Sequence, residues 1–251
     1  MWWKKNRGKA VCLLITAVVL AAAFWYGGNA PGLQGWGISP AKESMTADEK
    51  MSAAAVLAEE EGVSEVESGD VDYSVKNGME IDPETGKDRY LTDPVPEGKP
   101  LPVEPQNTIK TDEPHSCTLS VRCDTILDNL DWLVPEKVEI VPPDGVIFPE
   151  QEVTFYEGES VFDLLQREMK NAGIHMEFSD TPMYNSAYIE GIYNLYEFDC
   201  GELSGWMYRV NGWFPNYGCS RYLLEEGDQV EWVFTCSLGV DVGGYSALGS
   251  S

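Results

Sequence analysis

The chain contains few basic residues and almost no histidine. Its 251 residues include 17 Lys and Arg against 42 Asp and Glu, for a formal net charge of −25, and only 2 His. Affinity for nucleic acid comes largely from Lys and Arg, so this excess of negative charge argues against a nucleic-acid partner. The shortage of histidine and the absence of any Cys-x-x-Cys spacing argue against a metal site. We therefore predict no nucleic-acid ligand and no metal.

The short motifs typical of catalysis are also missing. The sequence has no Gly-x-Ser-x-Gly, no His-Glu-x-x-His and no glycine-rich phosphate loop. No histidine lies near Cys200 in the sequence, so the pattern does not indicate a Cys–His nucleophile. We expect a protein that binds or displays something rather than an enzyme, with no required cofactor.

Only one long uncharged run is present, and it lies at the start of the chain. Residues 10–26 carry no charge and follow a flank with four basic residues and no acidic one. At about 1.5 Å per residue this run just spans the hydrocarbon core of a membrane. Residues 1–26 are thus a membrane anchor, or a cleaved signal segment with a small-residue site at Ala21–Ala23. In both cases the basic flank predicts that the chain after residue 26 is exported.

Composition divides the rest of the chain into a spacer and a domain. Residues 27–113 carry 19 acidic and 7 basic residues, recurrent prolines and no sustained apolar periodicity. Such a segment buries too little apolar surface to offset the entropy of ordering, which predicts a disordered spacer. The aromatic residues and cysteines concentrate after it, which predicts a folded domain over residues 114–243 and a flexible tail over residues 244–251. Deleting residues 40–110 should then leave the melting of the domain nearly unchanged.

Within the domain, periodicity predicts strands, one helix and more strands. The helix begins after Ser160, has an approximate capping box with Asp163 and ends at Gly173. Alternation and turn signals predict eight short strands, over residues 117–123, 137–141, 153–156, 175–178, 188–193, 206–210, 222–224 and 230–236. This order predicts an α+β fold, a β-grasp-like mixed sheet with one packed helix.

Five cysteines lie in the predicted extracellular domain, where thiols tend to pair. Cys200 and Cys219 bracket the hairpin that contains Trp206, which makes them the first candidate pair. Cys236 could reach Cys123 if the first and last strands are neighbours. The odd number leaves at least one cysteine unpaired or paired between chains.

Three aromatic residues, Trp213, Phe214 and Tyr217, lie in a short stretch between two predicted strands, among Gly, Pro and Asn. Turn residues lie on the surface, so these side chains either contact a partner or fold back onto the sheet. Trp206 and Tyr208 alternate on the preceding strand and would support such a platform. A flat aromatic surface suits a large planar ligand.

Four separated motifs resemble one known family. They are Glu157-Gly-Glu-Ser-Val-Phe-Asp-Leu-Leu165, Gly205-Trp-Met-Tyr-Arg-Val-Asn-Gly-Trp213, Gly218-Cys-Ser-Arg-Tyr222 and Glu226-Gly-Asp-Gln-Val-Glu-Trp232. Residues 117–243 resemble the transcobalamin-like C-terminal domain, a bacterial surface domain similar to the small β-domain of eukaryotic cobalamin carriers. In those carriers this domain closes over cobalamin held mainly by a helical barrel, which this chain lacks.

The resemblance implies that the domain captures cobalamin or a related corrinoid for a membrane importer, with the five aromatic residues named above as ligand contacts. The alternative is a protein–protein display or adhesion module with no small-molecule ligand, whose partner is another surface protein. A concave apolar pocket beside residues 211–218 would favour the first function, and a convex flat patch the second.

The predicted topology can be tested on intact cells. Because four basic residues precede the uncharged run, residues 27–251 should lie outside and be removed by added protease. Immunoblotting for the C-terminal domain before and after protease measures this. Protection of the domain until the cells are lysed would show the opposite orientation.

Overall fold

A computed structural model describes residues 45–61 and 69–245. The predicted anchor or signal segment and most of the predicted tail lie outside these residues. Within the described ranges, no helix is both long enough and apolar enough to cross a membrane.

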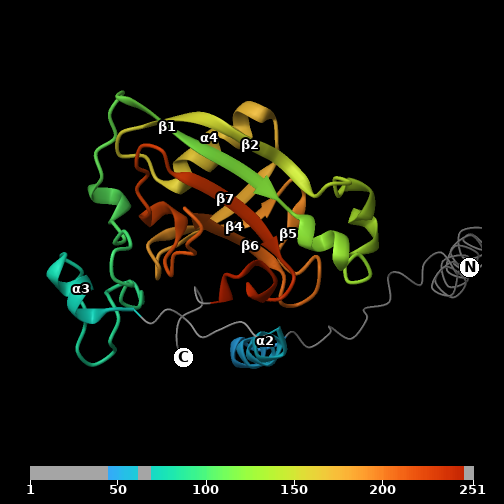
Figure 1. Ribbon diagram of the computed structural model, residues 1–251, viewed down its shortest axis with the longest axis horizontal. Coiled ribbons are helices and arrows are strands. Elements are labelled where there is room, and N and C mark those ends of the chain that lie inside the picture. Colours follow the sequence, from blue (N-terminus) through green and yellow to red (C-terminus); the bar gives the residue numbers. More distant parts are fainter. Residues whose placement is uncertain (1–44, 62–68, 246–251) are drawn as a thin grey trace, which may run out of the picture. The chain divides into compact units, whose positions relative to one another are not determined.

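The main sheet has four strands in the order β2-β1-β7-β6. Strand β1 (Pro114–Arg122) pairs antiparallel with β2 (Val146–Tyr156) and parallel with β7 (Gln229–Thr235), which pairs antiparallel with β6 (Gly205–Val210). Figure 1 shows the first and last strands side by side in the middle of the sheet. The polar–apolar alternation of β1 explains this place, because every second side chain from Cys117 onward is buried.

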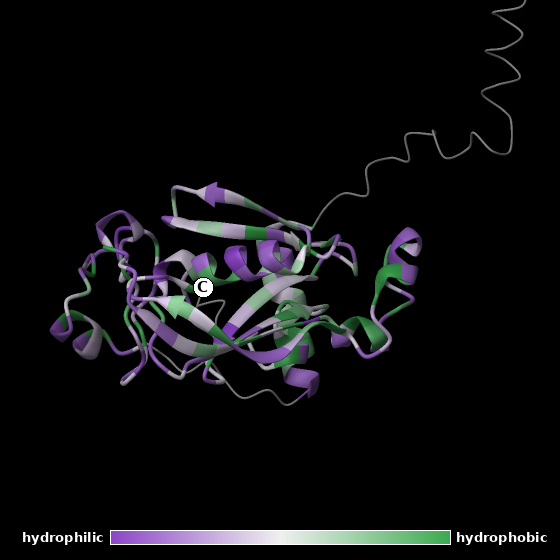
Figure 2. Cartoon of the chain, turned by 90° about the horizontal axis from the view of Figure 1, so that it is seen from above, coloured by the Kyte–Doolittle hydropathy of each residue, from purple (hydrophilic) through white to green (hydrophobic). Residues whose placement is uncertain are grey.

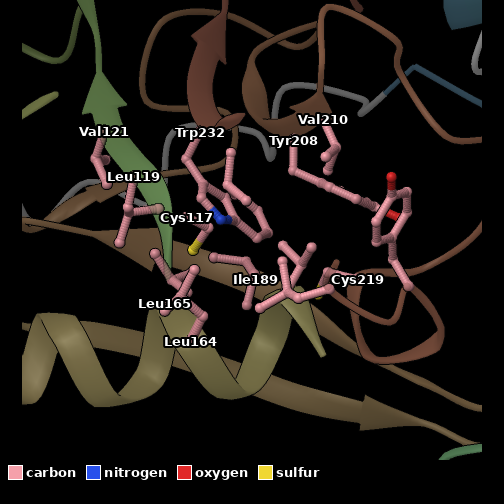
Figure 3. Close-up of a cluster of buried hydrophobic side chains, with 14 of the residues drawn as sticks. Cys117, Leu119, Val121, Leu164, Leu165, Ile189, Tyr208, Val210, Cys219 and Trp232 are labelled. Carbon is pink, nitrogen blue, oxygen red and sulfur yellow. The ribbon is translucent and has the colours of Figure 1, made fainter. Parts of the chain in front are cut away.

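Helix α4 (Val161–Ala172) packs against this sheet. Ser160 accepts from the Asp163 backbone N–H, and the Asp163 side chain accepts from the Ser160 N–H, so the predicted capping box is confirmed. Gly173 ends the helix with a φ of 69°, a conformation that glycine adopts without strain. Figure 3 shows Leu164 and Leu165 extending from the helix into the cluster around Trp232. This helix closes one side of the main core.

A second sheet of three strands follows the helix. It consists of β3 (Met176–Thr181), β4 (Ser186–Ile192) and β5 (Leu195–Tyr196) in that order, all antiparallel. Ile189 and Ile192 of β4 are buried in the main core. Figure 2 shows hydrophilic and hydrophobic residues interleaved along the strands, as expected for sheets with one buried face.

The mixed α+β architecture is confirmed, and two of the predicted strands are wrong. The segment predicted as a strand over residues 137–141 forms the end of a 3-10 helix, η4 (Pro135–Ile140), and its C-cap Val141. Proline at its first position favours a helical start, which outweighs a short alternation. The predicted strand over residues 222–224 contributes only one isolated bridge, between Leu223 and Ser160. The division into two sheets was not predicted.

The disordered spacer predicted over residues 27–113 is wrong for residues 69–113, which we call the strap. The strap contains α3 (Val71–Lys76) and η2 (Pro105–Asn107), and its Met79 and Val95 are buried in the main core. Its backbone also bonds to the domain, because the Val103 N–H donates to the Arg221 carbonyl at 2.9 Å. An extended segment with few apolar residues can therefore dock on a folded domain when the domain supplies the apolar contacts and the hydrogen-bond partners.

Four further helical elements complete the described chain. Helix α2 (Ala47–Glu61) buries Ala54 and Ala58 against Val240, which belongs to η6 (Val240–Val242). The 3-10 helices η3 (Asp124–Asp128) and η5 (Cys219–Arg221) lie in the connections of the domain.

Two matched variants test whether the strap is docked. Val95 is 0% exposed and Ile109 is 80% exposed, and both belong to the strap. Val95→Ala should lower the free energy of unfolding by about 2 kcal/mol, whereas Ile109→Ala should leave it nearly unchanged. Urea titration followed by tryptophan fluorescence measures both. Equal effects would show that the strap does not pack on the domain.

Candidate ligand groove

A groove of 570 Å³ lies where strand β6 and the loop after it meet the strap and the β3–β4 hairpin. Small-molecule sites in proteins span about 300–1,000 Å³, so this volume is in the range of a binding site. The first part of its lining comes from β6 and the loop after it, with Trp206–Tyr208 and Pro215–Gly218. The second part comes from the hairpin, with Thr181, Tyr184 and Ser186–Tyr188. The third part comes from the strap, with Lys87 and Leu91–Asp93.

Three of the five aromatic residues singled out in the sequence line this groove, namely Trp206, Tyr208 and Tyr217. Trp206 is half-buried, and its Nε1 donates to the Leu195 carbonyl at 2.8 Å. This bond fixes the indole between the two sheets, so its ring is presented to the groove in a set orientation.

The other two, Trp213 and Phe214, do not line the groove. Asn211 and Gly212 have φ angles of 53° and 77°, and this tight turn brings Trp213 back to pair with Val210. Phe214 is 5% exposed. Trp213 is half-buried against the main core, with the Lys99 Nζ 5.6 Å from its ring centre. The structure thus shows these two side chains folded back, and the exposed platform predicted for them is not present.

The hydroxyl groups of Tyr208 and Tyr217 are both used inside the protein. Tyr208 donates to the Tyr217 carbonyl at 2.8 Å, and Tyr217 donates to the Pro100 carbonyl of the strap at 2.7 Å. Burial raises the pKa of both phenols well above their usual value. They are therefore neutral donors at every physiological pH, and because they are only 8% and 7% exposed, they belong mainly to the core and present little ring surface to the groove.

The polar groups of the groove lie on its walls and rim. Lys87 and Asp93 of the strap form an ion pair at 2.7 Å. Asn216 donates to the Asp93 carbonyl at 3.1 Å, while its Oδ1 is buried without a partner in the part of the chain that the structure describes. Tyr184 and Tyr188 at the mouth are 51% and 46% exposed. The groove thus combines an aromatic mouth with a small number of polar groups.

The strap that supplies one wall is held by Arg221, which is 1% exposed. Its guanidinium donates to Asp88 at 2.8 Å, to Thr92 at 2.7 Å and to Glu104 at 3.1 Å. It also donates to the Val103 carbonyl at 3.2 Å and lies 5.1 Å from the Tyr90 ring centre. Every one of these partners belongs to the strap. Sequence reasoning missed this site, although an arginine between Cys219 and Tyr222 in a stretch rich in apolar residues signals a need for carboxylate partners.

The predicted Cys200–Cys219 disulfide is wrong. Cys219 packs in the main core, where its Sγ lies 3.6 Å from the Ala187 carbonyl. Cys200 belongs to a second cluster together with Cys123 and Cys236. The two cysteines therefore lie in different clusters. The structure holds no disulfide among the five described cysteines, so Cys123 and Cys236 are not bonded to each other in it either.

Metal coordination finds no support in the described ranges. No group of three or more His, Cys, Asp or Glu side chains there is placed to hold a metal ion.

Comparison with known proteins gives one family match. The sequence model of DUF4430, described as a domain of unknown function, matches residues 158–235. This range includes α4 and every groove residue outside the strap. No curated protein gives a significant match.

Two solved structures are weakly similar. Haptocorrin in complex with Cbi has 16% sequence identity and a TM-score of 0.36, over 51% of this chain and 26% of that chain. A candidate metal-binding protein from Ruminococcus gnavus ATCC 29149 has 14% identity and a TM-score of 0.30, over 48% of this chain and 96% of that chain. This chain therefore spans about a quarter of the haptocorrin chain.

The buried arginine can be tested against an exposed one. Arg221→Ala leaves the buried Asp88 without its cation, so we expect a loss of about 3–5 kcal/mol in the free energy of unfolding. Arg122→Ala removes a single exposed ion pair with Asp124 and should cost less than about 1 kcal/mol. Chemical denaturation of both variants measures the difference. A small effect at Arg221 would show that it does not hold the strap.

Proposed function

We propose that this chain is an exported binding module that holds a large, planar, mainly apolar ligand in the groove, and that the ligand is cobalamin or a related corrinoid. The observation that carries this proposal is the groove itself, a preformed hollow whose lining includes Trp206, Tyr208 and Tyr217. The ligand class comes from the motifs that resemble the transcobalamin-like domain.

Ring surface is the main source of affinity in this proposal. Burial of apolar area contributes about 25 cal/mol per Å², and aromatic side chains add offset stacking on a planar ligand. Trp206 is oriented by its bond to Leu195, so little rotamer freedom is lost on binding. The unpaired Oδ1 of Asn216 offers an acceptor to an amide N–H of the ligand if the wall opens slightly.

The groove is open to solvent at its mouth, where the side chains are exposed. A bound ligand would therefore be covered on one face only. A ligand as large as a corrinoid would project beyond the groove and stay accessible. This geometry suits a protein that captures the ligand and passes it on, so we propose a membrane importer as the partner. Residues 1–26 would anchor the chain to the cell membrane with the domain outside, or be cleaved to give a secreted form.

Binding without catalysis is part of the same proposal. No histidine lines the groove, and the raised pKa values of Tyr208 and Tyr217 keep both phenols protonated. Such groups do not exchange protons with a substrate near neutral pH.

One observation favours the alternative function of protein display. Apolar and aromatic side chains on the β3–β4 hairpin are exposed, and among them Met183 and Tyr184 are 64% and 51% exposed. Exposed apolar patches on soluble domains often mark contact sites for other proteins. A surface protein that docks on this hairpin would cover the mouth of the groove.

A spectral titration with cobalamin tests the main proposal, because the chromophore reports its own binding. Trp206→Ala should weaken binding at least tenfold, since aromatic anchors often cost 2 kcal/mol or more when truncated. Trp132→Ala is the matched control, because Trp132 is 58% exposed and does not line the groove. Thermal melting of both variants shows whether a loss of binding comes from unfolding.

Two results would contradict the proposal. Absence of any cobalamin binding by the unmodified chain at millimolar ligand would exclude the corrinoid, and the display function would take its place. Equal binding by the Trp206 variant and the unmodified chain would move the site away from the groove.

A further inference from the structure

Three buried cysteines meet in the second apolar cluster, against which the groove residue Trp206 packs. Cys123, Cys200 and Cys236 are 0%, 0% and 3% exposed, and they pack with Leu195 and Phe234 among others. Cys236 directly follows β7 of the main sheet, and Cys200 lies shortly after β5 of the second sheet. The cluster is thus the place where the ends of the two sheets come together.

The thiols of Cys200 and Cys236 contact the same short segment. The Cys200 Sγ donates to the Asn129 carbonyl at 3.5 Å, and the Cys236 Sγ lies 3.8 Å from the Thr125 Oγ1. Thr125 and Asn129 are joined in turn, because the Asn129 Nδ2 donates to the Thr125 carbonyl at 2.8 Å. Both thiols belong to the same apolar cluster and lie against one short segment, residues 125–129.

We propose that Cys200 and Cys236 form a disulfide when the chain folds in an oxidising compartment. This inference does not depend on the identity of the ligand. The bond would join the connection after β5 to the end of β7, so that it fastens the second sheet to the main one. The closed loop would contain Trp206 to Gly218 and hence one whole wall of the groove.

The step balances with a small-molecule disulfide as the oxidant. The thiolate of one cysteine attacks a sulfur of the oxidant, which forms a mixed disulfide and releases one thiolate. The second cysteine loses its proton and attacks the first cysteine's sulfur, which releases the second thiolate. Two S–H bonds are lost, one S–S bond forms, and the oxidant is reduced to two thiols. Because both cysteines are buried, exchange takes place before the cluster closes.

The remaining cysteines are placed less well for pairing with Cys236. In the parallel register Arg122 lies beside Val233, so an extended register would put Cys123 beside Phe234, two residues before Cys236. Strand spacing and rise then give a Cα separation of about 8 Å, beyond the usual limit of about 7 Å for a disulfide. Cys117 and Cys219 lie in the main core instead.

Peptide mapping of the full-length chain tests the proposal. The chain is refolded in a mixture of oxidised and reduced glutathione, its free thiols are blocked, and it is digested without reductant. We expect one linked peptide pair that contains Cys200 and Cys236, and an intact mass lower by two hydrogen atoms. Reduction should lower the melting temperature by roughly 10 °C, because the bond closes a long loop.

Single variants provide the controls. Cys200→Ala and Cys236→Ala should each lose the linked pair, whereas Cys219→Ala should keep it. If a variant does not fold, the peptide map of the unmodified chain decides whether the disulfide forms. Free thiols at both positions after oxidative refolding would overturn the proposal, and so would a bond from either cysteine to Cys123 or Cys219. Loss of cobalamin binding with an intact linked pair would count against the proposed ligand alone.

Discussion

The burial of one positive charge governs how this protein is assembled. Taking a guanidinium out of water costs several kcal/mol unless charges and hydrogen bonds replace the lost hydration. Arg221 lies inside the domain, yet its side-chain partners Asp88, Thr92 and Glu104 all come from the strap. The folded domain without its strap would leave the guanidinium without any of these partners. The strap is therefore part of the folding unit, although its composition resembles that of a linker.

The bonds between Arg221 and the strap also determine which residues form the groove. One wall comes from β6 and the loop after it, and these lie within the range that matches the family model. The facing wall comes from Lys87 and Leu91–Asp93, which lie outside that range. The Arg221 bond to Thr92 fixes the position of this second wall directly. Relatives of this domain with different strap sequences would thus share a framework and differ in what their grooves accept.

Local patterns in the sequence predicted the local structure well. The capping box of Ser160 and the alternation around Cys117 each depend on residues close in sequence, so they can be read without knowledge of the fold. The docking of the strap could not be read in this way, because Asp88 and Arg221 are joined only by tertiary contact. The wrong disulfide prediction has the same cause. Cys200 and Cys219 lie on either side of one hairpin in the sequence, but tertiary packing places them in different clusters. Of the predicted ligand contacts, Trp206, Tyr208 and Tyr217 line one groove, whereas the tight turn at Asn211 folds Trp213 and Phe214 back from it.

The parallel pairing of β1 with β7 sets the order in which the chain can fold. Leu119 pairs with Val230, about 110 residues later, so the central strands of the main sheet cannot meet until nearly the whole domain is available. Contacts so distant in sequence slow folding, because the entropy of closing the loop is lost before the contacts form. A chain that is threaded through a membrane from its N-terminus would remain unfolded during most of its passage. It would then close its sheet late, as the last strand emerges, and a chain truncated before residue 229 would lack the strand that joins β1 to β6.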